Sequence, residues 1–375
     1  MYRTWLEIDS KALRHNINAL RGFLRPETRF MAVVKANAYG HGLREVASIA
    51  FGENVRCFGV DNLEDAETLR SMFSEAQIVI LGYVMLENLE RVVDKNIELV
   101  VYNRETVEML NKAGKKLNKK TKIHLKLETG TSRQGILPAD VDNFIDLLRQ
   151  MSHVELVGLS THFATAEEVG ENKFLAQQLE ELNKVEYKIF KAGFSLEHIH
   201  CACSAAIPLF PKTHKSLVRV GLALYGLWPA PQIKEIVKNL ELQPVLSWKS
   251  RIAQIKTIPT GGSIGYGRTE TFEKDGKIAI VPVGYFDGYD RGLSSKAEVL
   301  VHGKKCRVIG RICMNMMMID VSVLDEIKIE DEVILIGQAR GGEETITAEE
   351  LAAKAETINY EIVARIRQDL PKIIK

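Results

Sequence analysis

A regular alternation of short apolar runs with amphipathic stretches constrains the fold of this chain more than any other feature. From residue 30 onward, eight apolar runs follow one another, and most precede a helical pattern such as LREVASIA or NLEDAETLRSM. This alternation is typical of repeated strand and helix units. The eight runs are FMAVVK (30–35), VRCFGV (55–60), QIVILG (77–82), ELVVYN (98–103), KIHLKLE (122–128), LVGLSTH (156–162), HIHCAC (198–203) and LVRVGLALYG (217–226).

Eight such units within roughly two hundred residues suit a closed parallel barrel, so we predict an α/β fold with an N-terminal (β/α)8 barrel of the TIM type. An open doubly wound sheet is the alternative. That class carries the phosphate fingerprint G-x-G-x-x-G after its first strand, and this chain has no such motif there. The sequence therefore favours the barrel.

The texture of the sequence changes after Trp228-Pro229-Ala230-Pro231, where long β-rich runs with glycine punctuation begin. We predict a barrel domain over 1–236 and a mainly β C-terminal domain over 237–375, with the first few residues free to join the β domain. The segment ITAEELAAKAETINYEIVARI near the C-terminus reads as helical. Thr347 is its expected N-cap, and Glu350 completes a capping box.

Composition excludes several function classes. The 50 Lys and Arg residues nearly balance 49 Asp and Glu, so no charge excess points to nucleic acid or to an anionic membrane. The first residues lack the pattern of a signal peptide, and no apolar run reaches the ~18 residues needed to span a bilayer. Five irregularly spaced cysteines fit reduced thiols and a cytoplasmic protein. No Cys and His set has zinc-ligand spacing, so no metal is expected.

Polar residues at the ends of five of the expected strands are the first candidates for a site, because the active site of a barrel lies at the carboxyl ends of its strands. They are Lys35, Arg133, His162, Ser204 and Arg219. Lys35 ends an apolar run, which disfavours the ammonium form and would leave a nucleophilic amine. A strand-end lysine that reaches solvent is the alternative interpretation.

The window around Lys35 resembles the lysine segment of the alanine racemases, and the resemblance runs nearly from end to end of the chain. Each motif alone is moderately specific, but together and in order they are very specific. The motifs are VVKANAYGHG (33–42), LETGTSRQG (127–135), THFATAE (161–167), SAA (204–206), VRVGLALYGL (218–227), SIGYGRT (263–269), VPVGYFDGYDRG (281–292), GRICMN (310–315) and TINYEI (357–362).

The resemblance implies an isomerase that holds pyridoxal 5′-phosphate (PLP) as a Schiff base on Lys35 and interconverts L- and D-alanine, which supplies D-alanine for peptidoglycan. Racemisation needs acid/base groups on both faces of Cα. By resemblance, Lys35 serves one face and Tyr266 the other. In the family this tyrosine comes from the partner subunit, which implies a homodimer with composite sites. From the residues alone, Tyr266 between two glycines is more typical of a turn or interface aromatic than of a base.

The resemblance also implies cofactor contacts. Arg219 would face the pyridine nitrogen of PLP, and because arginine does not give up a proton, that nitrogen would stay unprotonated. His162 and Arg219 would be the neighbours that help the Tyr266 phenol act near neutral pH. The remaining cofactor residues implied by the family are Ser204, Gly221 and Leu222 at the phosphate, with Tyr39 and Tyr360 closing that pocket. An ordinary ion pair remains the other interpretation of Arg219.

Substrate contacts follow in the same way. Arg133 resembles the arginine that contacts the PLP phenolate and the substrate carboxylate, and the Met314 amide would add a hydrogen bond from the other subunit. Lys126 matches a lysine that some members carry as a carbamate, an anion that would hold Arg133. The residues resembling those of the corridor into the site, which would favour small amino acids, are Tyr285, Arg291 and Arg311.

The chain departs from the family pattern at three places. Cys203 stands where Asn is usual, Asn315 where Asp is usual, and Thr131-Ser132 where Met and a small residue are common. These departures leave other racemases and PLP decarboxylases of the same fold open as alternatives. A PLP-binding carrier without turnover and a Schiff-base aldolase without PLP also remain.

Overall fold

The computed structural model describes residues 1–170, 172–339 and 341–375. The chain forms two compact units. The barrel unit contains Arg14–Ala36 and Val46–Gln243, and the β unit contains Met1–Leu13, Asn37–Glu45 and Pro244–Lys375. Helix α1 (Ser10–Arg21) and the segment from helix α2 (Lys35–Tyr39) to helix α3 (Leu43–Gly52) therefore run through both units.

The barrel unit is built on eight parallel strands in the order β8-β7-β6-β5-β4-β3-β2-β9. The two outermost strands of this order are joined by two hydrogen bonds, from the Arg219 amide to the Ala202 carbonyl (3.0 Å) and from the Ile199 amide to Ser216 Oγ (2.7 Å). The sheet is thus a nearly closed barrel, as predicted, and the open sheet is excluded. The strands are β2 (Arg29–Val33), β3 (Cys57–Val60), β4 (Gln77–Ile80), β5 (Glu98–Val101), β6 (Thr121–Lys126), β7 (Val154–Ser160), β8 (His198–His200) and β9 (Leu217–Val220).

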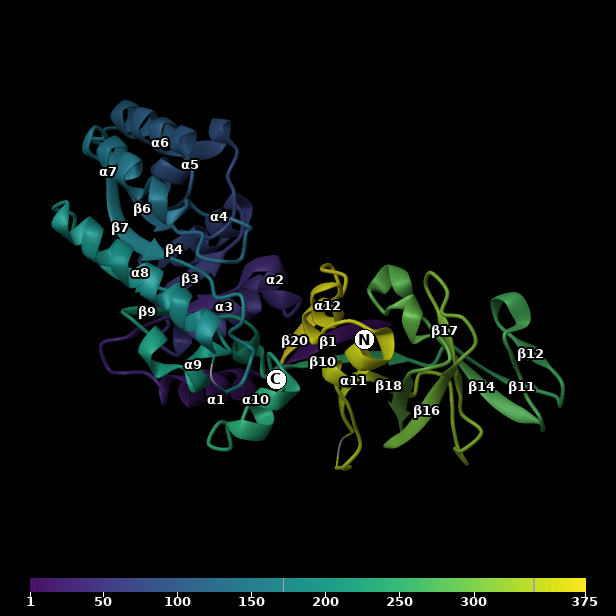
Figure 1. The fold of residues 1–375 in the computed structure, drawn as a ribbon. Coiled ribbons are helices and arrows are strands. Elements are labelled where there is room, and N and C mark those ends of the chain that lie inside the picture. Colours follow the sequence, from purple (N-terminus) through teal and green to yellow (C-terminus); the bar gives the residue numbers. More distant parts are fainter. Residues whose placement is uncertain (171, 340) are drawn as a thin grey trace. The chain divides into compact units, whose positions relative to one another are not determined.

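Helices follow most of the barrel strands and cover their outer side (Figure 1). Asparagine side chains cap three of these helices, since Asn62, Asn103 and Asn172 accept from the amides of Asp65, Thr106 and Leu175, respectively. The remaining helices of this unit are α4 (Leu63–Met72), α5 (Leu89–Asp94), α6 (Arg104–Leu117), α7 (Val141–Arg149), α8 (Lys173–Lys191), α9 (Ala206–Leu209) and α10 (Pro231–Ile236), with 3-10 turns at Leu86–Asn88, Pro138–Asp140, Pro211–Thr213 and Leu222–Tyr225.

Most strands of the β unit form a largely antiparallel sheet in the order β11-β14-β17-β16-β15-β18-β10-β1-β20, with β19 paired to β18, while β12 and β13 form a separate two-stranded sheet (Figure 1). The N-terminal strand β1 pairs with β10, and the C-terminal strand β20 pairs with β1, so both chain ends belong to this sheet. The strands are β1 (Thr4–Ile8), β10 (Leu246–Arg251), β11 (Gln254–Ile258), β12 (Ser263–Ile264), β13 (Glu270–Thr271), β14 (Gly276–Val281), β15 (Glu298–Val301), β16 (Lys304–Ile309), β17 (Met317–Asp320), β18 (Glu332–Gln338), β19 (Thr345–Ile346) and β20 (Lys372–Ile374).

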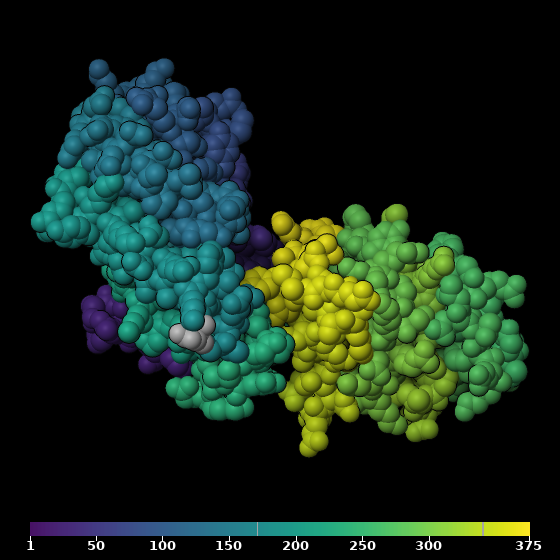
Figure 2. All heavy atoms as spheres, viewed as in Figure 1, coloured from purple at the N-terminus to yellow at the C-terminus, as the bar shows by residue number. Residues whose placement is uncertain are grey.

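The helical segment expected near the C-terminus is divided into α11 (Ala348–Ala355) and α12 (Asn359–Ala364). Thr347 caps α11 by accepting from the Glu350 amide, as the sequence predicts. Glu356 lies in the left-handed region with a φ of 59°, which ends α11 before the chain can continue as one helix. In Figure 2 these C-terminal residues, in yellow, lie directly against residues of the same unit that are coloured green.

Three short 3-10 turns complete the β unit, at Tyr266–Arg268, Tyr285–Asp287 and Arg291–Leu293. Within the described ranges, no helix is long and apolar enough to cross a membrane.

Candidate active site

The carboxyl end of the barrel carries the residues that the sequence singles out. Lys126 is the last residue of β6, Arg219 lies within β9, and Lys35, His162 and Ser204 follow β2, β7 and β8. Strands β2 and β9 are neighbours, with Met31 paired to Arg219, so the Lys35 segment begins beside the Arg219 strand. The topology therefore places five candidate residues at one end of the barrel.

Lys35 is more open than the apolar run before it suggests. Its side chain is 42% exposed, and its Nζ lies 3.9 Å from the carboxylate of Asp61, which follows β3. The expectation of an apolar environment for this amine was wrong, because the apolar side chains belong to the strand and the lysine lies beyond its end. Asp61 is a neighbour that the sequence argument missed, although it follows an apolar strand run as the other candidates do.

The backbone directly after Lys35 is unusual. Ala36, Asn37, Ala38 and Tyr39 all have positive φ values between 52° and 54°. Left-handed backbone costs L-residues about 1–2 kcal/mol each, so this turn needs support from its surroundings. The Asn37 side-chain oxygen accepts from the Leu43 amide (3.0 Å), and the Gly42 amide donates to the Asn37 carbonyl (2.9 Å). The turn therefore holds the chain that follows Lys35 in one defined path.

Arg219 is a buried guanidinium fixed by several acceptors. Its NH1 donates to Nδ1 and to the carbonyl of His200, both at 2.7 Å. Its NH2 donates to the Thr161 carbonyl at 2.8 Å and lies 3.3 Å from Nδ1 of His162. No carboxylate appears among these partners, so the ion-pair interpretation of Arg219 does not hold for these contacts.

Positive charge accumulates around His162 and Lys126. Burial, followed by the charges of Arg219, Lys126, Arg133 and Lys35, lowers the pKa of His162 to about 2. Burial and the charges of Arg219 and Arg133 lower the pKa of Lys126 to about 7. Near neutral pH His162 is therefore a neutral ring, and a substantial fraction of Lys126 is a neutral amine.

The loop that carries Arg133 is organised by Glu128. Burial raises the pKa of this carboxylate, but hydrogen bonds from the backbone of Arg133, Gly130 and Ser132 and from the Thr131 hydroxyl lower it to about 2. The Arg133 amide donates to Glu128 Oε2 at 3.0 Å, while its side chain is exposed. The guanidinium is thus anchored through its backbone and remains open to a ligand.

Ser204 is positioned by the turn after β9. Its Oγ accepts from the amides of Gly221 (3.1 Å) and Ala223 (3.2 Å), at the start of the 3-10 turn that begins with Leu222. A hydroxyl and several backbone amides at the start of a helical turn form a common anion-binding arrangement. The structure brings Ser204, Gly221 and Leu222 together as the sequence led us to expect.

The other candidate residues belong to the β unit. The rings of Tyr39 and Tyr360 lie 6.2 Å apart. Tyr266 is 71% exposed in a turn where Gly265 and Gly267 both have positive φ, and a Cβ on Gly267 would lie 3.2 Å from the Arg311 guanidinium. The Tyr266 turn therefore lies beside Arg311.

A second loop of this unit carries more exposed candidates. Tyr285 and Met314 are both exposed, on segments joined by hydrogen bonds from the Tyr285 amide to the Cys313 carbonyl and from the Phe286 amide to the Met314 carbonyl. Arg291 and Asn315 are exposed nearby in the sequence. Other residues of the β unit therefore leave these side chains exposed to solvent.

The carboxyl end of the barrel fits an anionic cofactor with an aldehyde. It offers a primary amine at Lys35, a fixed donor at Arg219, and a surplus of cations that, in addition to burial, lowers the pKa of His162 and Lys126. A phosphate and a phenolate would neutralise that surplus. The residues present are therefore compatible with PLP, which Lys35 would hold covalently and Ser204 and the Gly221 turn would hold through its phosphate.

Two family comparisons cover nearly the whole chain. Residues 8–229 match the alanine racemase N-terminal domain, and residues 245–374 match the alanine racemase C-terminal domain. An alanine racemase of Symbiobacterium thermophilum is 41% identical over 99% of this chain and 97% of the relative. An alanine racemase of Leptospira interrogans is 39% identical over 100% of this chain and 96% of the relative.

Solved structures give the same picture. An alanine racemase of Clostridium difficile 630 superposes with a TM-score of 0.94 at 34% identity, covering 100% of this chain and 96% of that one. An alanine racemase of Bacillus anthracis with bound L-Ala-P superposes with a TM-score of 0.93 at 33% identity, over 100% and 96% of the two chains. Both domains of this chain are thus similar to those of such enzymes in sequence and in fold.

Proposed function

Because this chain belongs to the alanine racemase family, we propose that it is a PLP-dependent isomerase that interconverts L- and D-alanine by a two-base mechanism. The observation that carries the proposal is the joint position of Lys35 and Arg219 at one end of the barrel, on neighbouring strand ends. When bound, PLP supplies the electron sink that stabilises negative charge at the substrate Cα. The protein residues hold the reactants and move the proton.

Lys35 is the proposed base on one face of Cα, with its Nζ as the atom that takes and returns the proton. The side chain is partly exposed and has the Asp61 carboxylate as its nearest counter-charge at 3.9 Å. Such a weak contact allows the amine to leave its position and reach a substrate. The left-handed turn from Ala36 to Tyr39 would keep the backbone still while the side chain moves.

Tyr266 is the proposed base on the opposite face, contributed by the partner subunit of a homodimer. Its phenol is 71% exposed in the chain, and the neighbouring loops expose Phe286, Met314 and Met316 as well. Exposed aromatic and methionine side chains in loops are typical of surfaces that a partner covers. The C-terminal β domain would thereby complete the active site of the other subunit.

Arg219 is the proposed partner of the PLP pyridine nitrogen. An arginine has donors only, and the carbonyls of Thr161 and His200 hold its guanidinium in place. Arg219 would therefore donate a hydrogen bond to the pyridine nitrogen without giving up its proton, which would favour return of the proton to Cα over transamination. His162, neutral and next to Arg219, is proposed to orient the Tyr266 phenol.

The remaining contacts are proposed from the family pattern. Ser204, Gly221 and Leu222 would bind the phosphate, with Tyr39 and Tyr360 closing its pocket. Arg133 would bind the substrate carboxylate together with the Met314 amide. The corridor into the site would be lined by Tyr285, Arg291 and Arg311, all of which are exposed. Two arginines there would attract an amino-acid carboxylate.

Lys126 is proposed to carry a carbamate. Only a neutral amine reacts with CO₂, and the pKa of Lys126 lies at about 7, so the reactive form is available near neutral pH. The neutral amine forms an N–C bond to CO₂ and releases one proton, so a neutral side chain becomes an anion; starting from the ammonium form, two protons are released in all. A carbamate there would offset part of the positive surplus and would hold the Arg133 guanidinium, as the charge of Arg133 already acts on Lys126.

In the cell, we propose a cytoplasmic enzyme that supplies D-alanine for peptidoglycan.

Incubation with L-alanine and PLP in D₂O tests the reaction. A two-base racemase produces D-alanine with deuterium at Cα. Exchange without racemisation would indicate a single base, CO₂ release would indicate a decarboxylase, and absence of both reactions would leave a PLP carrier. A screen of several L-amino acids then tests the breadth of the substrate pocket, where Cys203 and Asn315 depart from the family pattern.

A further inference from the structure

A row of hydrogen-bonded side chains runs through the barrel from Arg219 to the opposite, amino-terminal end. Arg219 NH1 lies 2.7 Å from His200 Nδ1, and His200 Nε2 lies 3.0 Å from His124 Nδ1. His124 Nε2 lies 2.7 Å from Glu98 Oε2. Glu98 is the first residue of β5, so the row reaches from the proposed cofactor site to the other end of the barrel.

The proton positions along this row are forced by its first member. Arginine has no acceptor, so His200 Nδ1 accepts and carries no hydrogen. A neutral His200 then has its hydrogen on Nε2 and donates to His124 Nδ1. His124 in turn has its hydrogen on Nε2 and donates to Glu98. All three hydrogen bonds therefore point the same way, from the guanidinium to the carboxylate.

The two rings in the middle of the row are shielded from water. His124 is 0% exposed and His200 is 1% exposed. Burial, then the charge of Arg219, lowers the pKa of His200 well below its ordinary value, which agrees with a neutral ring. Gly158 on the neighbouring strand makes room for His124, since a Cβ there would lie 2.0 Å from His124 Nδ1. Water therefore cannot replace a missing member of the row without rearrangement of the barrel.

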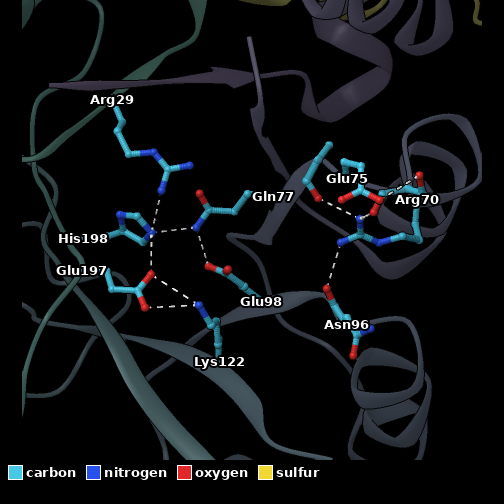
Figure 3. A pocket seen from close by; sticks show the side chains of 11 residues that line it. Arg29, Arg70, Glu75, Gln77, Asn96, Glu98, Lys122, Glu197 and His198 are labelled. Carbon is cyan, nitrogen blue, oxygen red and sulfur yellow. Dashed lines mark hydrogen bonds and ion pairs between the residues drawn. The ribbon is translucent and has the colours of Figure 1, made fainter. Parts of the chain in front are cut away.

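Glu98 is itself held in place at the amino end (Figure 3). Gln77 Nε2 donates to Glu98 Oε2 (2.7 Å) and lies 2.9 Å from His198 Nε2, which also accepts from Arg29 NH1 (3.1 Å). Burial raises the pKa of Glu98, but the hydrogen bonds from His124 and Gln77 lower it below its usual value. The Glu98 side chain is only 12% exposed, so its carboxylate is a fixed acceptor at the end of the row.

We infer that Glu98 is a positioning residue for Arg219, which it orients through the tautomers of His124 and His200. Without an acceptor at Glu98, His124 can move its hydrogen to Nδ1 and donate to His200. The hydrogen of His200 would then lie on Nδ1 and face an N–H of Arg219, and two facing donors would turn the guanidinium away. The importance of this orientation for PLP rests on the function proposed above.

The first test is the tautomeric state of the wild-type protein without cofactor. Long-range ¹⁵N–¹H spectra of histidine-labelled protein distinguish protonated from bare ring nitrogens. The proposal requires a hydrogen on Nε2 and none on Nδ1 for both His124 and His200. A hydrogen on His200 Nδ1 would overturn it. This measurement involves neither PLP nor activity, so it stays informative if the proposed function fails.

The second test compares Glu98→Leu with Glu98→Gln, and uses Glu197→Gln at the same end of the barrel as the control. Leucine removes the acceptor, whereas glutamine keeps an oxygen in the same place. Glu98→Leu should show mixed or reversed tautomers and bind PLP about tenfold more weakly, as expected for one lost buried hydrogen bond. Glu98→Gln and Glu197→Gln should keep wild-type tautomers and bind PLP within about twofold.

Two results would contradict the proposal. A folded Glu98→Leu variant with wild-type tautomers would show that the carboxylate does not select them. Changed tautomers with unchanged PLP affinity would show that the row does not reach the cofactor site. If Glu98→Leu does not fold, the wild-type spectra and the Glu98→Gln variant still decide the matter. Failure of the wild-type protein to bind PLP would instead count against the proposed function.

Discussion

The two ends of the barrel contain the same kinds of side chain but pair them differently. At the amino end, charges are matched: Lys122 lies 3.3 Å from Glu197, and Arg29 and Gln77 converge on His198 and Glu98 (Figure 3). At the carboxyl end, burial and then the charges of neighbouring cations lower the pKa of Lys126 and His162. Paired charges at the amino end stabilise the fold. Excess positive charge at the carboxyl end destabilises the fold, and an anionic ligand can remove that destabilisation.

This difference separates residues kept for stability from residues kept for function. In barrels of this kind, chemistry belongs to the carboxyl ends of the strands and stability to the amino ends. Here the row of hydrogen bonds from Arg219 to Glu98 connects the two ends of the barrel, since it begins at Arg219 near the carboxyl end and ends at the Glu98 carboxylate at the amino end. The same substitution at the two ends should therefore affect different properties, activity or stability, and by different amounts.

The largest effect is expected for Lys35→Ala. Loss of the amine removes both the covalent attachment of PLP and one of the two bases, so racemisation should fall at least about a thousandfold in both directions. The visible absorbance of bound PLP should also disappear. Lys122→Ala, which removes an amine from the amino end, is the matched control and should keep both. Borohydride-stable labelling of Lys35→Ala would show that another lysine holds the cofactor.

Tyr266→Phe is expected to come next. The phenol is exposed in the chain, so its loss should leave the fold intact while the rate that depends on it falls by roughly 10²–10⁴. Deuterium exchange at Cα should be retained for one enantiomer and lost for the other, since Lys35 still serves its own face. Tyr187→Phe, at another exposed tyrosine, should change neither rate. Equal retention of exchange for both enantiomers would exclude Tyr266 as a base.

A smaller effect, on stability, is expected for Lys126→Met in protein free of cofactor and CO₂. The pKa of Lys126 is about 7 in the fold against an ordinary 10.5. Between these values the unfolded chain binds a proton that the folded chain lacks, so stability should rise with pH across that window. Burial of the protonated amine therefore lowers the free energy of unfolding by its full amount below pH 7 and by nothing above pH 10.5.

Methionine removes this penalty. Because the side chain is only partly buried, Lys126→Met should stabilise the protein by about 1–2 kcal/mol at pH 7, and the gain should vanish towards pH 10.5. Urea unfolding at several pH values measures the change. A gain that does not vary with pH would mean that the amine is not titrating in this window.

The strands and the family were readable from the sequence because they depend on local pattern. All eight apolar runs became barrel strands, and Thr347 became the cap of α11. The left-handed turn after Lys35 was not predicted because none of its residues is a glycine, and only Asn37 among Ala36 to Tyr39 has a side chain that favours positive φ. The turn is supported by hydrogen bonds to Asn37 from the amides of Gly42 and Leu43 in the segment that follows it.

The hydrogen-bonded row from Arg219 to Glu98 is partly visible in the sequence. His198 and His200 alternate in β8, and His124 interrupts an apolar stretch of β6, so polar rings stand where barrel-interior side chains are expected. Alternation predicts which way such side chains point. It cannot predict that rings from two strands meet, since that depends on the stagger of β6, β7 and β8, including the irregularity between Ile123 and His124.

The smallest effect is expected for Lys122→Met, which completes the comparison on a single strand. Lys122 and Lys126 lie on β6, one near each end. Lys122 forms an ion pair with Glu197 in which the side chains are 41% and 50% exposed. An exposed pair of this kind contributes about 0–1 kcal/mol, so the substitution should destabilise the protein slightly. The expected change in the free energy of unfolding is opposite in sign to that of Lys126→Met, although both substitutions replace lysine with methionine. Urea unfolding at pH 7 of both variants measures the two signs side by side. Stabilisation by both, or by neither, would mean that the two ends of the barrel do not differ in the pairing of their charges.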